Sequence, residues 1–460
     1  MSLFNPTGGA YKAPPTPFGG FIDGRPAQTA PHLLVSGLTG TGKSRRVLMP
    51  AILMWRGPVV AVSSKPDLYG ECLERRLAWG GYDKTFLLDL SGEVPNDAVP
   101  DGVHRVIVDP AVMAASDDDA LDIATILMQS GAAGAGGGNN SGGGDAFWES
   151  VSTAPLAAIL RAAPTIAWAR TAVSKLCLDD GVVIDAEDHA ALSSIEGACW
   201  DSAVALLEEG SPVLAAELAS ANQLDSKMRD SIAVTMKSAV SPWLRSTVVG
   251  RGGETAFVPD MLSHPASTLF IVAPATGVAA GAAVSCVDMI SKRWRANQTE
   301  PVRLERLLMV VDELCNTMPW PKLPTVVTES RAMGIHLLVA VQATSQLAKR
   351  FGPQGMAELR EVFPATLLLV GAPEWEMLER AAKWHGQVER QKISTDHLNR
   401  QSQSTEKGEA VMATSLLPQS IDEGRLLRGR RPGDNSSKVH EEGLLVQLID
   451  ISQIPFKPTS

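Results

Sequence analysis

Short apolar runs alternate with helical segments along the first part of the chain. The runs lie at residues 32–36, 58–64, 85–90 and 105–110, and amphipathic helical patterns follow the first two. Strands that alternate with helices are typical of a parallel sheet covered by helices on both faces. The pattern therefore predicts an α/β domain. Residues 1–30, which are rich in Pro and Gly, are expected to form an extended arm before it.

The periodicity changes in the middle of the chain. Residues Gly131 to Gly144 are a Gly-rich, low-complexity segment, which is typical of a flexible linker. From Phe147 to about Ser246 the apolar positions recur with helical spacing, and the one β-like run, at residues 181–185, is too short to predict a strand. We expect this block to be an all-α insertion.

Strand-like runs then return, at residues 268–273, 307–313, 336–342, 366–371 and 444–450. The α/β domain is thus expected to be interrupted and then completed. We predict an arm over 1–30, the first part of the α/β domain over 31–120, the linker and all-α domain over 121–250, and the second part of the α/β domain over 251–460. The polar residues 386–418 predict a loop or a hairpin.

One stretch has the length of a membrane-spanning helix. Residues 268–287 carry no charged side chain, but they are mostly small, and Pro274 and Gly277 divide them. The β-rich start favours a buried strand over 268–273, followed by a helix from about Val278 to Arg295. We therefore expect no transmembrane segment here.

Candidate chemistry begins directly after the first strand. Residues 37–44 read GLTGTGKS, which fits the pattern G-x-x-x-x-G-K-[ST] without a mismatch, between a strand and a helix. In that setting, backbone N–H groups and a helix N-terminus converge on phosphate oxygens. The pattern predicts a nucleotide site in which Lys43 reaches the β/γ-phosphates and Ser44 binds Mg²⁺. The complete set is Gly37, Thr39, Gly40, Thr41, Gly42, Lys43 and Ser44.

Two acidic residues follow a later strand. The apolar run that starts at Leu307 ends in Asp312 and Glu313. A carboxylate at the carboxyl end of a buried strand beside a phosphate-binding loop can hold a Mg²⁺ ion, and a second carboxylate can polarise the attacking water. We predict these roles for Asp312 and Glu313, respectively.

The next strand suggests two further catalytic residues. Gln342 ends the run 336–342 and is expected near the γ-phosphate if this strand lies between those of the phosphate-binding loop and Asp312. Arg331 precedes the same run in a segment expected to be short and exposed. We consider it a candidate arginine finger that acts on a neighbouring subunit of a ring.

Two other charged segments favour plainer interpretations. Lys65 and Asp67, after the second strand, are either a loop ion pair or neighbours of the nucleotide, and the ion pair is slightly favoured. The basic segment 425–431 predicts a solvated turn rather than a DNA site.

Composition limits the partners only weakly. The 460 residues include 41 basic and 51 acidic side chains, a net charge of −10, so bulk electrostatics give no reason to bind DNA or anionic lipid. Any DNA contact must be local. The five cysteines form no C-x-x-C pair, and residues 1–30 have no apolar signal-peptide core, which favours a reduced cytosolic chain.

The order of these motifs resembles that of TraG/TraD-type coupling proteins of type IV secretion and conjugation, within the FtsK/HerA superfamily. The resemblance rests on the P-loop, SKPDL, the helical insertion that begins with Phe147, LLMVVDE, and the ESRAMGIHLLVAVQATSQL segment. It implies a RecA-like domain with an all-α domain, ATP and Mg²⁺ as cofactors, and hexamers at the inner face of the membrane. Lys43, Ser44, Asp312, Glu313 and Gln342 match its nucleotide-binding and hydrolytic positions.

The resemblance also implies partners. They are a secretion-channel or membrane-anchor protein, and a cargo that is either a relaxase with single-stranded DNA or an effector protein. Family members mostly begin with transmembrane helices, and this sequence shows none. Either a separate membrane protein anchors the chain, or the anchor was removed, or the chain belongs to a soluble branch; we expect a cytoplasmic chain that reaches the membrane through a partner. Two alternatives stay open: an FtsK-like duplex DNA translocase, and a substrate receptor whose nucleotide site only regulates docking.

Overall fold

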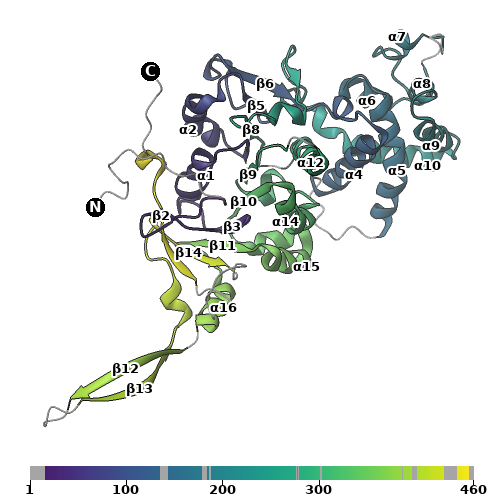
Figure 1. Cartoon of the computed structure of the whole chain (residues 1–460). Helices are drawn as coiled ribbons and strands as arrows, with labels where there is room; N and C mark the ends of the chain where they lie inside the picture. Colours follow the sequence, from purple (N-terminus) through teal and green to yellow (C-terminus); the bar gives the residue numbers. More distant parts are fainter. Residues whose placement is uncertain are drawn as a thin grey trace.

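The computed structural model describes residues 16–134, 143–178, 184–185, 188–275, 277, 279–300, 303–385, 387–395, 401–428 and 443–454. One large sheet runs through the α/β part of the molecule (Figure 1). Its strands are β1 (Phe21–Ile22), β2 (Arg25–Pro26), β3 (His32–Ser36), β4 (Val59–Ser63), β5 (Thr85–Asp89), β6 (Val103–Ile107), β7 (Thr255–Ala256), β8 (Thr268–Val272), β9 (Leu307–Val311), β10 (Ile335–Val341), β11 (Ala365–Leu369), β14 (Glu423–Arg428) and β15 (Leu444–Gln447).

The strands stand in the order β2-β1-β15-β14-β11-β3-β10-β9-β4-β8-β5-β6-β7. From β11 to β7 every pairing is parallel, and the antiparallel pairings gather at the other end of the sheet. Strand β10 lies between β3 and β9, so the carboxyl ends of the strands before the P-loop, Asp312 and Gln342 are neighbours. The strand before Gln342 therefore lies between those of the P-loop and Asp312, which is the order that the prediction for Gln342 required.

The central strands are apolar on both sides because helices cover both faces of the sheet. Along β9, for example, Met309 belongs to one hydrophobic core, whereas Leu308 and Val310 belong to the other. The second core packs under α1 (Met49–Met54) and α2 (Asp67–Arg76). The first packs under α12 (Ala280–Ala296), α13 (Leu314–Thr317), α14 (Leu323–Met333) and α15 (Leu347–Val362).

An all-α block separates β6 from β7 within the described residues. Its helices are α3 (Pro110–Met113), α4 (Asp117–Gly134), α5 (Gly143–Ala162), α6 (Ile166–Ala172), α7 (His189–Leu192), α8 (Trp200–Leu207), α9 (Pro212–Asn222), α10 (Ser226–Ala239) and α11 (Ser246–Val249). The expected Gly-rich linker is partly helical, because α4 continues to Gly134 and α5 begins at Gly143. Its residues 135–142 lie outside the described part, as do residues 181–183 of the short β-like run.

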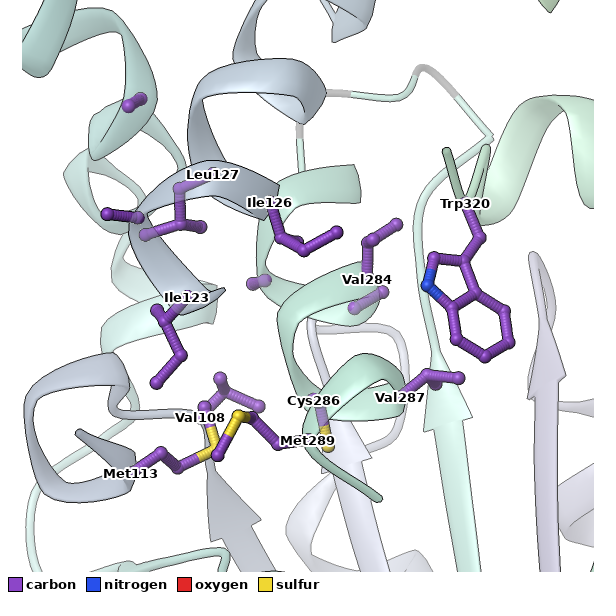
Figure 2. Packing of buried hydrophobic residues seen from close by; sticks show 14 of the residues in the cluster. Val108, Met113, Ile123, Ile126, Leu127, Val284, Cys286, Val287, Met289 and Trp320 are labelled. Carbon is purple, nitrogen blue, oxygen red and sulfur yellow. The ribbon is translucent and has the colours of Figure 1, made fainter. Parts of the chain in front are cut away.

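The α-helical block shares its core with the sheet domain through α12. Figure 2 shows Ile126 of α4 beside Val284 of α12, with Ile123 and Leu127 on the same helix α4. Val287, one turn further along α12, lies beside Trp320. These side chains are buried, so the interface is continuous apolar packing of the kind found inside a domain.

The charge-free stretch forms β8 and α12, as the sequence predicted, and α12 is buried over most of its length. None of the helices in the described ranges is long and apolar enough to cross a bilayer. The polar residues after α16 (Trp375–His385) form a hairpin of β12 (Gln387–Thr395) and β13 (Gln401–Ala410) that projects from the body (Figure 1).

Candidate active site

The P-loop follows strand β3 and leads into a helix. After Ser36 the chain turns through Gly40 and Gly42, whose φ angles are 84° and 86°, into a π-helical turn over Lys43–Leu48 that continues as α1. A side chain at either glycine would strain this left-handed backbone. Thr39 lies at the exposed tip, and the hydroxyl of buried Thr41 donates to the Leu38 carbonyl at 2.8 Å.

Lys43 turns back onto its own loop. Its Nζ donates to the carbonyl oxygens of Gly37 at 2.6 Å and Leu38 at 3.1 Å. Burial lowers the pKa of Lys43, and the nearby carboxylates of Asp312 and Glu313 oppose that effect. The lysine is thus a buried cation at the mouth of the loop, where phosphate oxygens would be its natural ligands.

Asp312 meets Ser44 at the carboxyl end of β9. The Ser44 hydroxyl donates to Asp312 Oδ2 at 3.0 Å, while the buried Oδ1 has no hydrogen-bond partner among the described residues. Burial raises the pKa of Asp312 to about 6. A hydroxyl beside a carboxylate with a free oxygen offers the hard oxygen ligands that Mg²⁺ prefers, so these residues fit the expected cation.

Glu313 and Gln342 form a second pair beside the first. Gln342 Nε2 donates to Glu313 Oε1 at 3.2 Å, and Gln346 Oε1 accepts from the Gln342 backbone N–H at 3.3 Å. Glu313 has a φ of 54°, an uncommon conformation for a residue with a side chain, at the start of α13. Backbone strain of this kind concentrates at functional sites.

Asp67 lies nearer the site than the sequence suggested. Its Oδ1 accepts from the Ser63 hydroxyl at 3.2 Å and from the Leu68 N–H at 2.8 Å, and its charge contributes to the raised pKa of Asp312. Asp67 therefore begins α2 near Asp312, which is expected to bind Mg²⁺, while Lys65 is exposed.

Arg331 lies apart from these residues. The segment expected to be short and exposed is the last turn of α14, at the amino end of β10, whereas the site lies at the carboxyl end. Burial, followed by the nearby charges of His336 and Arg331, lowers the pKa of His32 to about 3. In the described part of segment 425–431, residues 425–428 belong to β14 rather than to a turn.

Sequence reasoning missed one buried acid at this edge. Glu374, between β11 and α16, is 3% exposed and accepts hydrogen bonds from Ser36 and Thr344. These partners are far apart in the sequence, and no local motif marks the acid.

Comparisons with a family model and with solved structures find similarity to conjugative coupling proteins. Residues 306–420 match the family model described as the TraM recognition site of TraD and TraG. No curated protein sequence matches the chain. The solved structure of plasmid coupling protein TrwB with the non-hydrolysable ATP analogue ADPNP is 17% identical, with a TM-score of 0.55, over 96% of this chain and 91% of the chain in that structure.

Two further solved structures of TrwB have a similar fold. TrwB in complex with ADP and Mg²⁺ is 17% identical with a TM-score of 0.53, over 96% of this chain and 90% of that one. Unbound TrwBdeltaN70, described as a bacterial conjugative coupling protein, is 18% identical with a TM-score of 0.54, over 90% and 86%. The resemblance to TraG/TraD-type coupling proteins is confirmed. The chain has their RecA-like P-loop fold with an all-α insertion.

Proposed function

We propose that this chain is an ATP-hydrolysing coupling protein, which recruits a substrate to a type IV secretion or conjugation channel and drives its transfer. The contact between Ser44 and Asp312 carries the nucleotide part of the proposal, because it leaves one buried carboxylate oxygen of Asp312, beside the P-loop, without a partner among the residues that the structure describes. The match of residues 306–420 and the TrwB-like fold support the coupling role.

Each side chain of the candidate active site would have its own role in ATP hydrolysis. Lys43 and the backbone N–H groups of the P-loop would hold the phosphates, and Ser44 with Asp312 would hold Mg²⁺. When bound, Mg²⁺ neutralises negative charge on the phosphates. Glu313 would take a proton from the attacking water, and Gln342 orients that carboxylate through its hydrogen bond.

Two substitutions test hydrolysis. Lys43→Ala and Glu313→Gln should both abolish ATP turnover, and the second should still retain ATP. The matched control is Glu358→Gln, an exposed acid on α15, which should keep wild-type turnover. Undiminished ATPase activity in Glu313→Gln would refute the role of this residue.

The partners are also part of the proposal. By the resemblance, the chain would reach the inner face of the membrane through an anchor or channel protein, act as a homo-hexamer, and carry a relaxase with single-stranded DNA or an effector protein. DNA affinity that falls steeply with salt would support a DNA cargo, because phosphate neutralisation releases counterions. A flat salt response would favour a protein cargo. Substrate transfer that survives Glu313→Gln would instead indicate a receptor without motor activity.

Arg331 remains a proposed finger for a neighbouring subunit. In a closed head-to-tail ring, its position away from its own P-loop is compatible with action on another subunit. Mixing Arg331→Ala with Lys43→Ala subunits tests this role. Activity recovered in the mixture would support action in trans, and no recovery at any mixing ratio would argue against it.

A further inference from the structure

A single buried carboxylate joins three separate elements at the carboxyl edge of the sheet. Glu374 Oε1 accepts from the Ser36 hydroxyl at 2.7 Å and from the Thr344 backbone N–H at 2.7 Å. Its Oε2 accepts from the Thr344 hydroxyl at 2.6 Å and from Arg360 Nη2 at 3.3 Å. Both oxygens are therefore used, as a buried charge requires.

The donors belong to the two halves of the candidate active site. Ser36 is the last residue of β3 and directly precedes Gly37, whose carbonyl oxygen accepts from Lys43. Thr344 stands two residues after Gln342, which donates to Glu313. Glu374 thus connects the loop expected to hold the phosphates with the loop that orients the expected catalytic carboxylate.

We propose that Glu374 is a positioning residue for ATP hydrolysis, which fixes the Gln342 loop relative to the P-loop. The proposal rests on the hydrolytic function proposed above. Glu374 also directly precedes α16, so the same carboxylate joins both loops to the helix that leads into the β12–β13 hairpin. A shift of about 1 Å in a catalytic group can reduce the rate roughly 100-fold. Loosening this link should therefore affect the chemical step more than nucleotide binding.

Glu374→Gln is the most informative variant. Glutamine keeps an oxygen for Ser36 and the Thr344 N–H, but it places an amide where Arg360 and the Thr344 hydroxyl now donate. We expect kcat for ATP to fall roughly 10-fold in Glu374→Gln and roughly 100-fold in Glu374→Ala, with KM within about threefold of wild type.

The chain offers a matched control two residues further on. Glu376 accepts from the same arginine, Arg360 Nη1, at 3.0 Å, but its side chain is 78% exposed, and within the described ranges it has no hydrogen bond to either loop. Glu376→Gln removes one carboxylate from the same arginine without breaking the link between the loops. It should keep kcat within about twofold of wild type.

A binding measurement gives a readout that is independent of turnover. Fluorescent ADP and a fluorescent non-hydrolysable ATP analogue are titrated into wild type, Glu374→Gln and Glu376→Gln in the presence of Mg²⁺. Because Gln342 is expected near the γ-phosphate, a displaced Gln342 loop should bring the ratio of the two affinities closer to one in Glu374→Gln. The thermal unfolding temperature of each variant separates this effect from loss of folded protein.

The outcomes distinguish the two proposals. A kcat or an affinity ratio in Glu374→Gln equal to that of Glu376→Gln would overturn the positioning role and leave the ATPase proposal intact. A decrease of kcat and binding in proportion to folded protein would overturn it as well. If wild type hydrolyses no ATP, the proposed function fails, and the affinity ratio alone decides the role of Glu374.

Discussion

Two buried charges at opposite edges of the sheet, Arg76 and Asp312, are treated in opposite ways. At the amino edge, Arg76 of α2 is fully buried and donates to Thr268 Oγ1 and to the carbonyl oxygens of Trp55, Gly57, Ala266 and Ser267. At the carboxyl edge, the equally hidden Oδ1 of Asp312 has no partner among the described residues. Arg76 is satisfied within the protein, whereas Asp312 keeps an oxygen available for a ligand.

The partners of the two charges distinguish a structural role for Arg76 from a candidate functional role for Asp312. The partners of Arg76 are mostly backbone carbonyls of the loops that enter β4 and β8, and these have no part in the proposed chemistry. Around Asp312 the hydrogen bonds join side chains that belong to the proposed chemistry, as in the Ser44–Asp312 and Gln342–Glu313 pairs. Removing the charge of Arg76 should therefore destabilise the folded protein, whereas removing the charge of Asp312 should stabilise it.

The largest expected effect is at the amino edge. Arg76→Met leaves several buried carbonyl groups without donors, and we expect a loss on the order of 4 kcal/mol in the free energy of unfolding. Urea denaturation measures it, with Arg56→Met as the control, since exposed Arg56 lies over the same Trp79 ring as Arg76. ATPase activity per folded molecule should not change. Equal losses in the two variants would contradict the structural role of Arg76.

The second largest effect is an increase in stability, expected when the charge of Asp312 is removed. The pKa of Asp312 is raised from 3.8 to about 6, so the native state keeps a proton that the unfolded chain releases first. Without nucleotide, stability should fall between about pH 4 and pH 6 and stay lower above that range. Asp312→Asn removes this penalty and should stabilise the protein at pH 8 by up to roughly 3 kcal/mol.

The pH profile makes this prediction specific. Denaturation of Asp312→Asn and wild type should converge near pH 4, whereas the exposed Asp101→Asn should follow wild type throughout. A variant that is less stable than wild type at pH 8 would refute the idea that Asp312 is held at a cost. Mg²⁺-dependent stabilisation by nucleotide should also weaken in wild type below pH 6, because only the ionised carboxylate binds the cation.

A smaller gain is expected from the backbone of Glu313. Asparagine tolerates a φ near 54° better than glutamate does, so Glu313→Asn should raise the free energy of unfolding by about 1 kcal/mol while turnover is lost. Glu358→Asn, in a helix, should be neutral or slightly destabilising. If Glu313→Asn is no more stable than wild type, its backbone stores no strain that matters.

The smallest effect is expected at an exposed ion pair. Arg45, directly after Ser44, contacts both oxygens of Asp450 at 2.8 and 3.0 Å, but its side chain is 44% exposed. Arg45→Gln should cost less than about 1 kcal/mol, and the cost should decrease at high salt. A loss as large as that of Arg76→Met would show that burial does not determine the contribution of a charge in this fold.

Local pattern was sufficient for the parts of the site that lie on consecutive residues. The P-loop and the Asp312–Glu313 pair follow from a strand end and a motif, and the order of β3, β10 and β9 brings Gln342 beside Glu313. Their roles in binding and hydrolysis remain predictions, as do the domain limits. The RecA-like fold with its all-α insertion is confirmed.

Polar contacts between residues far apart in the chain could not be predicted from the sequence. Ser36 and Glu374 are 338 positions apart, and the sequence alone does not show whether an acidic residue is buried or exposed. Arg76 is a polar position in an amphipathic helix until the loops before β4 and β8 surround it. The sequence allows Asp67 either an ion pair with Lys65, which it slightly favours, or a place near the nucleotide. Local spacing cannot show that the Ser63 hydroxyl and the Leu68 N–H donate to its carboxylate.

The position of β3 also determines when the protein can fold during its synthesis. This strand is made before both of its neighbours, β10 and β11, which follow the helical block in the chain, with Leu33 opposite Leu338 and Leu34 opposite Thr366. Pairing over such separations is slow. A ribosome must therefore complete the helical block and most of the remaining chain before the P-loop strand is paired, and until then its edges are open to aggregation.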